Sequence, residues 1–236
     1  LFRSEVMLGK MGDGSGNCVA AGLAKGALLI DMSSSSPTGT RSLAATLETL
    51  GIACVDAPVS GGVKRAIDGS LAIMAGGTTD AIERARPVLN ALGKQIFATG
   101  ASGSGHAMKA LNNYVSAAGL IAAVEGVLAA QRFGLEPETV VKVLNASTGR
   151  NNSTENKFAQ FILSRSFAGG FGMGLMVKDL RTALEVAKAS DTPVPFAELC
   201  VDLWSRAEKE LGSSVDHTDV ARYWEHLAGK IGRAHI

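Results

Sequence analysis

Two kinds of hydrophobic pattern alternate over the first hundred residues of the chain. Four apolar runs of strand length lie between polar or glycine-bearing turns, at residues 27–32, 52–56, 70–75 and 95–98. Between them, residues 40–50 and 80–92 repeat apolar side chains at the spacing of an amphipathic helix. This alternation of strand and helix patterns predicts an α/β domain.

The strand-like runs stop before Gly105. A stretch rich in Ala, Leu and Val extends from Gly105 to Phe133 with few charged side chains, which predicts a long helix that is buried along most of its length. Further helical patterns follow at residues 138–144, 178–189, 196–211 and 220–227. The predicted fold class is therefore α/β plus all-α: a sheet domain over residues 1–102 and a helical domain over residues 103–236, joined by the long helix.

Composition narrows the choice of partners. The 236 residues are 46% hydrophobic and 19% charged with a net charge of +1, as in an ordinary globular protein. Lys and Arg are spread along the chain, so no nucleic-acid surface is expected. The apolar segment 114–130 is broken by Ser116 and Glu125, so no membrane span is expected. Three widely separated cysteines give no disulfide or metal-binding pattern, and buried or half-buried thiols in a cytoplasmic protein are expected.

A serine-rich segment, Asp31–Pro37, follows the first predicted strand. Ligands of open α/β sheets bind beyond the carboxyl ends of strands, and the hydroxyl and backbone N–H groups of this segment suit a polar ligand. The alternative is structural, because Ser36 before Pro37 is a typical N-cap of a following helix. The pattern leaves both interpretations open.

A second segment, Asp56–Gly62, follows the next predicted strand with the sequence DAPVSGG. The paired glycines Gly61 and Gly62 let the backbone come close to a ligand. Their adjacent N–H groups, together with the Ser60 hydroxyl, would suit an anion. The alternative is a plain tight turn, since glycine pairs are common between strands.

The third segment, Gly103–Asn113, begins the long apolar helix. Lys109 and Asn113 are four residues apart and therefore share one helix face. Burial brings a lysine towards the pKa range used in general acid–base catalysis, and Asn113 would orient the same substrate. The alternative is a solvated lysine near a helix start. His106 is predicted to be a surface residue.

The pair Lys178-Asp179 comes after a glycine-rich stretch and is predicted to open a helix. The helix dipole favours an aspartate near a helix N-terminus whether or not it has a function. The pair is therefore informative only together with the other segments.

A polar turn, Gly149–Ser153, lies between two helical patterns. Arg150 would bind an anion through paired hydrogen bonds, and Asn151 and Asn152 would bind hydroxyl groups. If this turn contacts the substrate, the far end of the substrate is polar. The alternative is a solvated loop between helices.

Taken in order, these segments resemble the β-hydroxyacid dehydrogenase family, to which 3-hydroxyisobutyrate dehydrogenase belongs. The family pattern is a Ser/Thr turn ending in Pro, then DAPVSGG, then GxGxxxKxxNN, and finally KD, and all four occur here in that order. The resemblance implies a partial Rossmann-type sheet domain and a long interdomain helix. It also implies a helical domain through which copies form a homodimer or homotetramer, a small hydroxyacid substrate, and NAD or NADP as the cofactor.

The resemblance further implies a role for each matching residue near the substrate. Lys109 would be the general acid–base, taking the hydroxyl proton as hydride leaves the carbon. Asn113 would orient the substrate hydroxyl. Ser60, Gly61 and Gly62 would hold the substrate carboxylate through N–H and hydroxyl donors.

On the cofactor side, the resemblance places Ser34 against the nicotinamide riboside and Lys178 over the cofactor, with Asp179 beside it at the substrate. The family begins with a strand and a GxGxxG turn that holds the pyrophosphate. Residues 1–17 lack this spacing and show no preceding strand pattern, so the chain is expected to begin within the sheet domain.

Two hypotheses follow for the function. The first is an NAD(P)-dependent oxidoreductase that oxidises a small β-hydroxyacid to the aldehyde or keto acid, or catalyses the reverse. Related imine reductases and chromatin-reading proteins replace the lysine, so Lys109 favours this alcohol chemistry. The alternative is a truncated, catalytically inactive helical assembly module of the same family. The mass of the intact protein discriminates between them.

Overall fold

The computed structural model describes Met7 and residues 18–229, and the chain divides into two compact units, Leu1–Leu111 and Asn112–Ile236. This division falls within the long helix α6 (Ser104–Phe133), whereas the sequence boundary was placed at residue 102, before the helix. The expectations about the GxGxxG spacing and the start of the chain concern residues outside the described ones.

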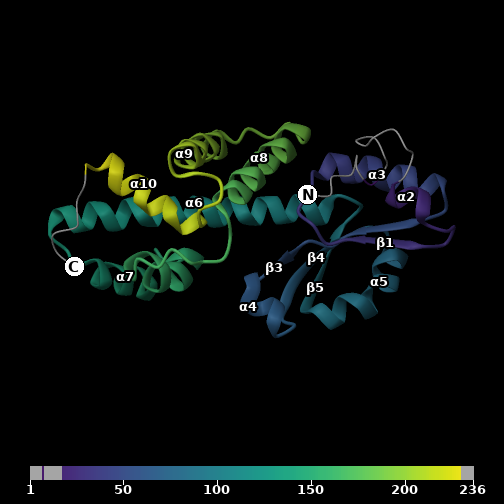
Figure 1. Cartoon of the computed structure of the whole chain (residues 1–236), viewed down its shortest axis with the longest axis horizontal. Coiled ribbons are helices and arrows are strands. Elements are labelled where there is room, and N and C mark those ends of the chain that lie inside the picture. The colour runs from purple at the N-terminus through teal and green to yellow at the C-terminus, as the bar shows by residue number, and fades with distance from the viewer. Residues whose placement is uncertain (1–6, 8–17, 230–236) are drawn as a thin grey trace. The chain divides into compact units, whose positions relative to one another are not determined.

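The first unit is built on a five-stranded mixed sheet of order β1-β2-β4-β3, in which β5 also pairs with β4 (Figure 1). β1 (Leu28–Asp31) is parallel to β2 (Ala53–Asp56), and β4 (Leu71–Gly76) is parallel to β5 (Gly93–Gly100). β4 runs antiparallel both to β2 and to β3 (Val59–Ser60). The four longer strands lie where the apolar runs predicted them, whereas the two residues of β3 are too few to leave a pattern.

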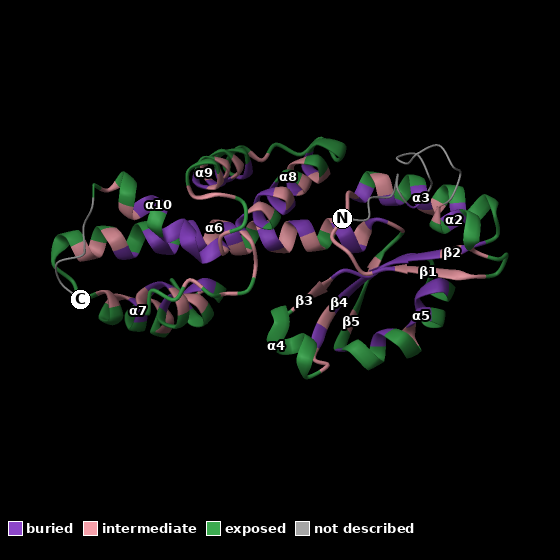
Figure 2. Ribbon diagram, viewed as in Figure 1, coloured by how far each residue is buried: buried purple, intermediate pink, exposed green. Residues whose placement is uncertain are grey.

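Helices α3 (Pro37–Thr49) and α5 (Thr79–Leu92) confirm the two helical patterns of the first unit. Buried residues lie along β2 and on one face of α3 and of α5 (Figure 2). Two short helices, α2 (Val19–Gly22) and α4 (Gly62–Ile67), were not predicted. All six residues of α4 are exposed, and six residues are too few to establish a helical period in the sequence.

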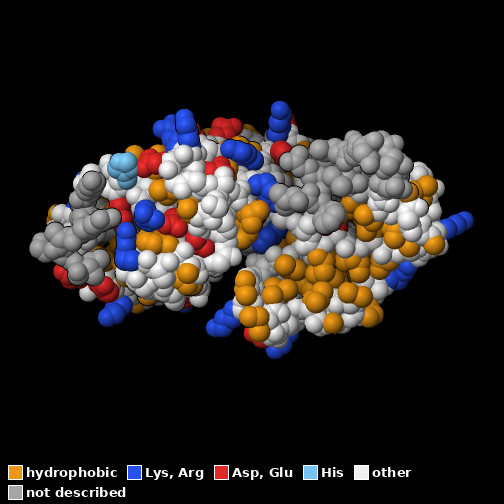
Figure 3. Space-filling view, in the orientation of Figure 1, with side chains coloured by type: hydrophobic (Ala, Val, Ile, Leu, Met, Phe, Trp, Pro, Cys, Tyr) orange, Lys and Arg blue, Asp and Glu red, His pale blue; other side chains and the backbone are white. Residues whose placement is uncertain are grey.

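Hydrophobic side chains also gather on the surface of the first unit (Figure 3). Its large apolar residues that are exposed include Val63, Ile67, Val88, Leu92 and Phe97. Its interior is formed by two apolar clusters, one around Ile73 and Leu89 and the other around Leu43 and Leu47. The sheet and its helices therefore have a dry core beside a partly apolar surface.

Up to residue 229, where the described part ends, the regular structure of the second unit is helical apart from an isolated bridge between Gly172 and Asp216. After α6 come α7 (Pro137–Ala146), the π-helix η1 (Thr154–Leu163), α8 (Met173–Ala189), α9 (Pro195–Leu211), the 3₁₀ turn η2 (His217–Asp219) and α10 (Val220–Leu227). All the predicted helices are confirmed. η1 was missed because only two of its large apolar side chains, Phe158 and Ile162, are fully buried. α8 begins at Met173, so Lys178-Asp179 lies in its second turn and the prediction that the pair opens the helix was wrong.

By length and composition α6 is able to cross a membrane, with a mean hydropathy of 1.4. Its apolar side chains instead form the core of the second unit, where Leu120, Val124 and Val127 are buried against the other helices. Trp204 of α9 and Leu180 of α8 are buried in the same cluster. Packing in this core accounts for part of the apolar composition of α6, since 39% of its most apolar 18-residue window is buried. The prediction that this helix is buried along most of its length was therefore wrong.

Candidate active site

Asp56, the last residue of β2, caps the N-terminus of α6. Its Oδ1 accepts a hydrogen bond from the backbone N–H of Gly103 at 2.7 Å, and its Oδ2 accepts one from the N–H of His106 at 2.9 Å. The side chain is buried, and burial raises the pKa of this carboxyl group, while the two backbone hydrogen bonds oppose the rise. These bonds join the second predicted segment to the third.

The glycines of the third segment permit a close approach between α6 and the sheet. A Cβ at Gly105 would lie 2.3 Å from the carbonyl oxygen of Met74 and 2.6 Å from that of Asp56. Gly103 has a φ of +87°, and a Cβ there would lie 2.6 Å from the carbonyl oxygen of Pro37. The GxG spacing thus allows α6, the helix that carries Lys109, to begin against the ends of β2 and β4.

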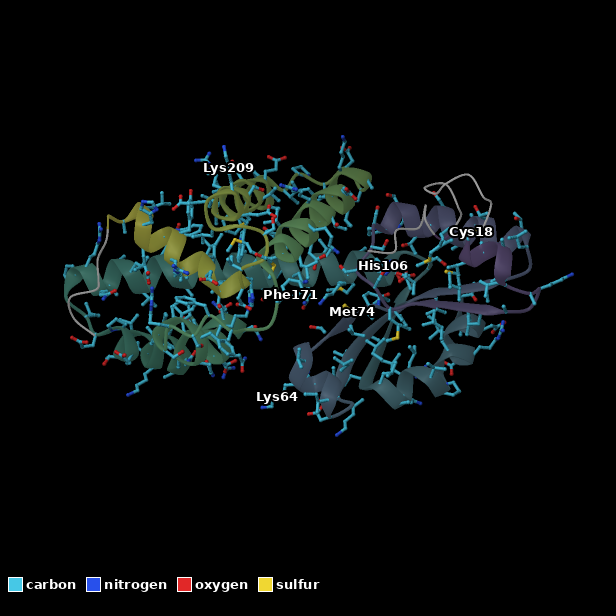
Figure 4. All side chains as sticks on the ribbon, viewed as in Figure 1. Cys18, Lys64, Met74, His106, Phe171 and Lys209 are labelled. Carbon is cyan, nitrogen blue, oxygen red and sulfur yellow. The ribbon has the colours of Figure 1, made fainter. Side chains whose placement is uncertain are left out.

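His106 is buried, with 1% of its surface exposed, so the prediction of a surface residue was wrong (Figure 4). Its Nδ1 lies 2.8 Å from the Thr40 hydroxyl. Its Nε2 lies 3.1 Å from the carbonyl oxygen of Ser33, and since a carbonyl oxygen only accepts, Nε2 is assigned the proton. Carboxylate oxygens of Asp31 and Asp56 each lie 3.9 Å from a ring nitrogen. His106 therefore joins the serine-rich segment to α6.

The serine-rich segment after β1 contains the predicted N-cap. Ser36 caps α3, since its Oγ accepts from the N–H of Gly39 at 3.5 Å, which confirms the structural interpretation. The buried hydroxyl of Ser33 has no hydrogen-bond partner in the described part of the chain. A buried hydroxyl without a partner costs free energy, so a polar ligand that satisfied it would be stabilised here. Ser34 is half-buried in the same segment.

The turn Ser60–Gly62 links β3 to α4. Ser60 is half-buried, and both glycines are exposed with positive φ angles, +136° at Gly61 and +65° at Gly62, which other residues rarely adopt. A Cβ at Gly62 would meet nothing within 4 Å, so space around this residue is open. The predicted anion-binding turn is therefore accessible, four residues along the chain from the Asp56 cap.

Asn113 is oriented by Asp179, and both residues belong to the second unit. Its Nδ2 donates to Oδ2 of Asp179 at 2.6 Å, and since an ionised carboxylate only accepts, this bond fixes the direction of the amide. Oδ1 of Asp179 lies 2.9 Å from Nζ of Lys178, and Asp179 is buried at 1% exposure. Asp179 therefore positions both Asn113 and Lys178. The half-buried Lys109 precedes Asn113 by one turn on the same face of α6.

The polar turn at residues 149–153 is occupied by contacts within the second unit. Arg150 is exposed and pairs with Glu155 at 3.7 Å. Oδ1 of Asn151 accepts from two backbone N–H groups at the start of η1, and Nδ2 donates to the carbonyl oxygen of Gly119 at 3.2 Å. Asn151 thus caps η1 and ties it to α6, which accounts for this residue without a ligand.

The cysteines are placed as the sequence predicts. All three thiols are free, with Cys54 and Cys200 buried and Cys18 half-buried. Burial, with the nearby carboxylates of Asp56 and Asp31, raises the pKa of Cys54 to about 12. This thiol therefore stays protonated near neutral pH and is unsuited to act as a nucleophile.

Comparisons with known proteins show the family of the chain. Residues 103–224 match the family model described as NAD-binding of NADP-dependent 3-hydroxyisobutyrate dehydrogenase, and residues 8–100 match the NAD binding domain of 6-phosphogluconate dehydrogenase. The chain belongs to the β-hydroxyacid dehydrogenase family. Both models describe NAD-binding domains, so the cofactor of this chain is NAD or NADP.

Individual relatives match most of the chain. It is 37% identical to 2-(hydroxymethyl)glutarate dehydrogenase of Eubacterium barkeri over 86% of its own length and 68% of the relative. It is 34% identical to 2-hydroxy-3-oxopropionate reductase of Escherichia coli over 95% of its length and 74% of the relative. With mitochondrial 3-hydroxyisobutyrate dehydrogenase of Mus musculus the identity is 35%, over 84% of this chain and 61% of that enzyme.

A solved structure of Mycobacterium tuberculosis 3-hydroxyisobutyrate dehydrogenase with L-serine matches the fold with a TM-score of 0.82 and 31% identity. The match covers 95% of this chain and 77% of that one. The predicted combination of a Rossmann-type sheet and a helical domain is thereby confirmed.

Proposed function

We propose that the protein is an NAD(P)-dependent dehydrogenase that oxidises a small β-hydroxyacid to the corresponding aldehyde or keto acid, or catalyses the reverse. The observation that carries this proposal is a set of hydrogen bonds linking the four motifs. His106 binds the serine-rich segment, Asp56 binds the start of α6, and Asn113 binds Asp179. Relatives named as hydroxyacid dehydrogenases support the same chemistry.

In the proposed oxidation, Lys109 accepts the proton of the substrate hydroxyl while hydride leaves the same carbon. Asn113, held by Asp179, orients the hydroxyl through its amide. The Ser60 hydroxyl and the backbone N–H groups of Gly61 and Gly62 hold the substrate carboxylate. This division of roles needs a lysine that is not fully hydrated, and Lys109 is half-buried.

The nicotinamide supplies the hydride acceptor in oxidation and the hydride donor in the reverse reaction. The residues proposed to hold it are Ser34, in the segment where the Ser33 hydroxyl is buried without a described partner, and Lys178, whose ammonium is oriented by Asp179. The unsatisfied Ser33 hydroxyl fits a polar ligand at this place.

Lys109→Met tests the assignment of the general acid–base. Such groups contribute about 10²–10⁴-fold, so kcat for reduction of NAD+ or NADP+ with a panel of β-hydroxyacids should fall by at least about 10²-fold. The assay uses the full gene product, with melting temperature as a check on folding. Lys209→Met, an exposed lysine of α9, is the matched control and should retain full activity.

Two outcomes would contradict the proposal. A Lys109→Met variant with wild-type kcat would remove Lys109 from the chemistry. A folded wild-type protein that turns over no β-hydroxyacid with either cofactor would instead favour the inactive helical assembly module.

Association of copies through the helical unit is part of the same proposal. Several large apolar side chains of that unit are exposed: Val115, Phe133, Val143, Phe196 and Leu227. Burial of these side chains between copies would stabilise a dimer or tetramer. Light scattering after gel filtration measures the mass in solution, and a monomer at micromolar concentration would contradict this part.

A further inference from the structure

Lys157 of η1 is a half-buried cation whose hydrogen-bonding capacity is mostly unused. Its Nζ donates to Oγ of Ser116 at 3.2 Å. An ammonium group has three N–H donors, and in the described part of the chain this is the one hydrogen bond that Lys157 makes. Burial lowers the pKa of Lys157 from 10.5 to about 8, while the carboxylate of Asp216 opposes the shift.

Asp216 is committed to other partners. Its Oδ2 accepts from the N–H groups of Gly170 at 2.7 Å and Phe171 at 3.1 Å, and its Oδ1 accepts from the N–H of Thr218 at 2.9 Å. No carboxylate among the described residues lies within 4.0 Å of the Lys157 ammonium, the limit for an ion pair. The Asp216 carboxylate therefore acts on Lys157 only at longer range. The ammonium is therefore partly desolvated, and no counter-ion from the described residues is in contact with it.

Ser116 is the last member of a polar stripe on α6. Asn112 and Asn113 precede Ser116 by four and three residues and lie on the same side of the helix, which carries Lys109 one turn earlier. At Leu120, one turn later, the same face is apolar and buried. Lys157 thus contacts the stripe at its end, about 4.5 Å along the helix axis beyond Asn113.

We infer that Lys157 binds a second carboxylate at the far end of the substrate, so that the protein prefers β-hydroxyacids with two carboxyl groups. The inference rests on the proposed function, which places the reacting hydroxyl at Lys109 and Asn113. From there a substrate chain of about three carbon–carbon bonds spans the distance to Ser116 and Lys157. An anion in contact would offset the cost of holding the ammonium away from water, which the neutral Ser116 hydroxyl cannot do.

Arg150 is the rival for this role. It is exposed on the 149–153 turn and already pairs with Glu155, so its charge is both hydrated and partly neutralised. A contact from a hydrated, paired cation gains less than one from a partly desolvated cation that has no described counter-ion in contact. Arg150 and Lys157 are seven residues apart in the second unit. Comparing the substrate preference of a variant of each shows which one binds the second carboxylate.

The test uses two substrates that carry the same hydroxymethyl and carboxylate groups, 2-(hydroxymethyl)glutarate with two carboxylates and 3-hydroxyisobutyrate with one. Lys157→Met is expected to lower kcat/KM for the dicarboxylate by about tenfold to a hundredfold, the effect of losing a hydrogen bond to a charged group. The change should be mainly in KM, and kcat/KM for 3-hydroxyisobutyrate should stay within about threefold. Lys209→Met is the control and should leave both values unchanged.

Binding without turnover provides a second measurement. In calorimetry the wild-type protein should bind glutarate more tightly than butyrate, and Lys157→Met should remove that difference. If Lys157→Met turns over 3-hydroxyisobutyrate and keeps the wild-type ratio of the two kcat/KM values, dicarboxylate over monocarboxylate, this inference is overturned. The proposed function would still stand. A change of this kcat/KM ratio in Arg150→Ala, with no change in Lys157→Met, would also overturn the inference. Absence of turnover with every β-hydroxyacid would instead count against the proposed function, while the glutarate measurement would still decide whether Lys157 binds a carboxylate.

Discussion

The ring of His106 and the carboxylate of Asp56 lie 3.9 Å apart, measured from Nδ1 to Oδ2, and neither side chain is exposed to solvent. The backbone N–H of His106 donates to the same carboxylate. The pair fixes the first turn of α6 against the end of β2, a strand that ends fifty residues earlier in the chain. Changes at either residue should therefore affect the placement of Lys109 as well as stability.

Asp56→Asn is expected to lower the free energy of unfolding by about 1–3 kcal/mol. An asparagine side chain has one acceptor oxygen, so the N–H of Gly103 or of His106 would face another donor in a buried place. Urea unfolding followed by circular dichroism measures the loss. Asp202→Asn in the exposed ion pair with Arg206 is the matched control, with an expected change below about 1 kcal/mol. Equal losses in both variants would argue against the cap.

Gly105→Ala and Gly126→Ala place the same methyl group at two points on α6 with opposite expected effects. At Gly105 the new Cβ would meet backbone oxygens at 2.3 and 2.6 Å, so the helix must shift, at a cost of about 1–3 kcal/mol or more. At Gly126 it would meet nothing within 4 Å, and alanine should stabilise the helix by up to about 1 kcal/mol. Thermal unfolding measures both changes, and a stabilised Gly105→Ala variant would disprove the close approach.

Asp179→Asn is expected to reduce kcat by about 10²-fold without unfolding the protein. The buried carboxylate orients the Asn113 amide, and a small misplacement of a substrate-orienting group has an effect of this size. A double-mutant cycle with Asn113→Ala separates positioning from a merely structural role. If Asp179 acts through Asn113, the second change adds little to the first, and fully additive losses in kcat would rule out that route.

Lys157 predicts a pH dependence of stability. Its pKa of about 8 in the folded protein lies below the ordinary 10.5, so the unfolded chain binds this proton more tightly. The buried charge therefore lowers stability below about pH 8, and the loss is recovered as the pH rises from about 8 to about 10.5. Lys157→Met should be more stable than wild type at neutral pH, with the difference shrinking over that range. Melting temperatures across it measure this, and a constant difference would contradict the lowered pKa.

The same titration predicts a change in substrate preference. The kcat/KM for 2-(hydroxymethyl)glutarate divided by that for 3-hydroxyisobutyrate should fall as the pH rises through about 8, because the ammonium loses its charge. A change in the chemical step shared by the two substrates affects both values and cancels in this ratio. The ratio in Lys157→Met should not depend on pH, and a parallel fall in the variant would assign the effect to another group.

Hydrophobic patterns in the sequence predict the helices and strands in which buried residues recur at a regular spacing. They fail for residues whose burial or contacts depend on parts of the chain that are distant in sequence. β1 and α3 were predicted because apolar residues recur at strand or helix spacing. Likewise, the shared face of Lys109 and Asn113 follows from helical period alone. His106 was misassigned because its burial depends on Gly105 allowing contact with the sheet. The bond from Asn113 to Asp179 crosses 66 positions, and Lys157 is informative only through its contact with Ser116, 41 positions away.

The uninterrupted course of α6 across the division at Leu111 and Asn112 restricts how this chain can change in length. One added residue in an α-helix rotates everything beyond it by about 100° and advances it by about 1.5 Å. An insertion between Lys109 and Asn113 would therefore turn the amide to another side of the helix, although each unit kept its own core. Surface loops tolerate insertions of many residues. In this four-residue interval, by contrast, the helical phase fixes the proposed base relative to the amide proposed to orient the substrate, and a single added codon would be enough to separate them.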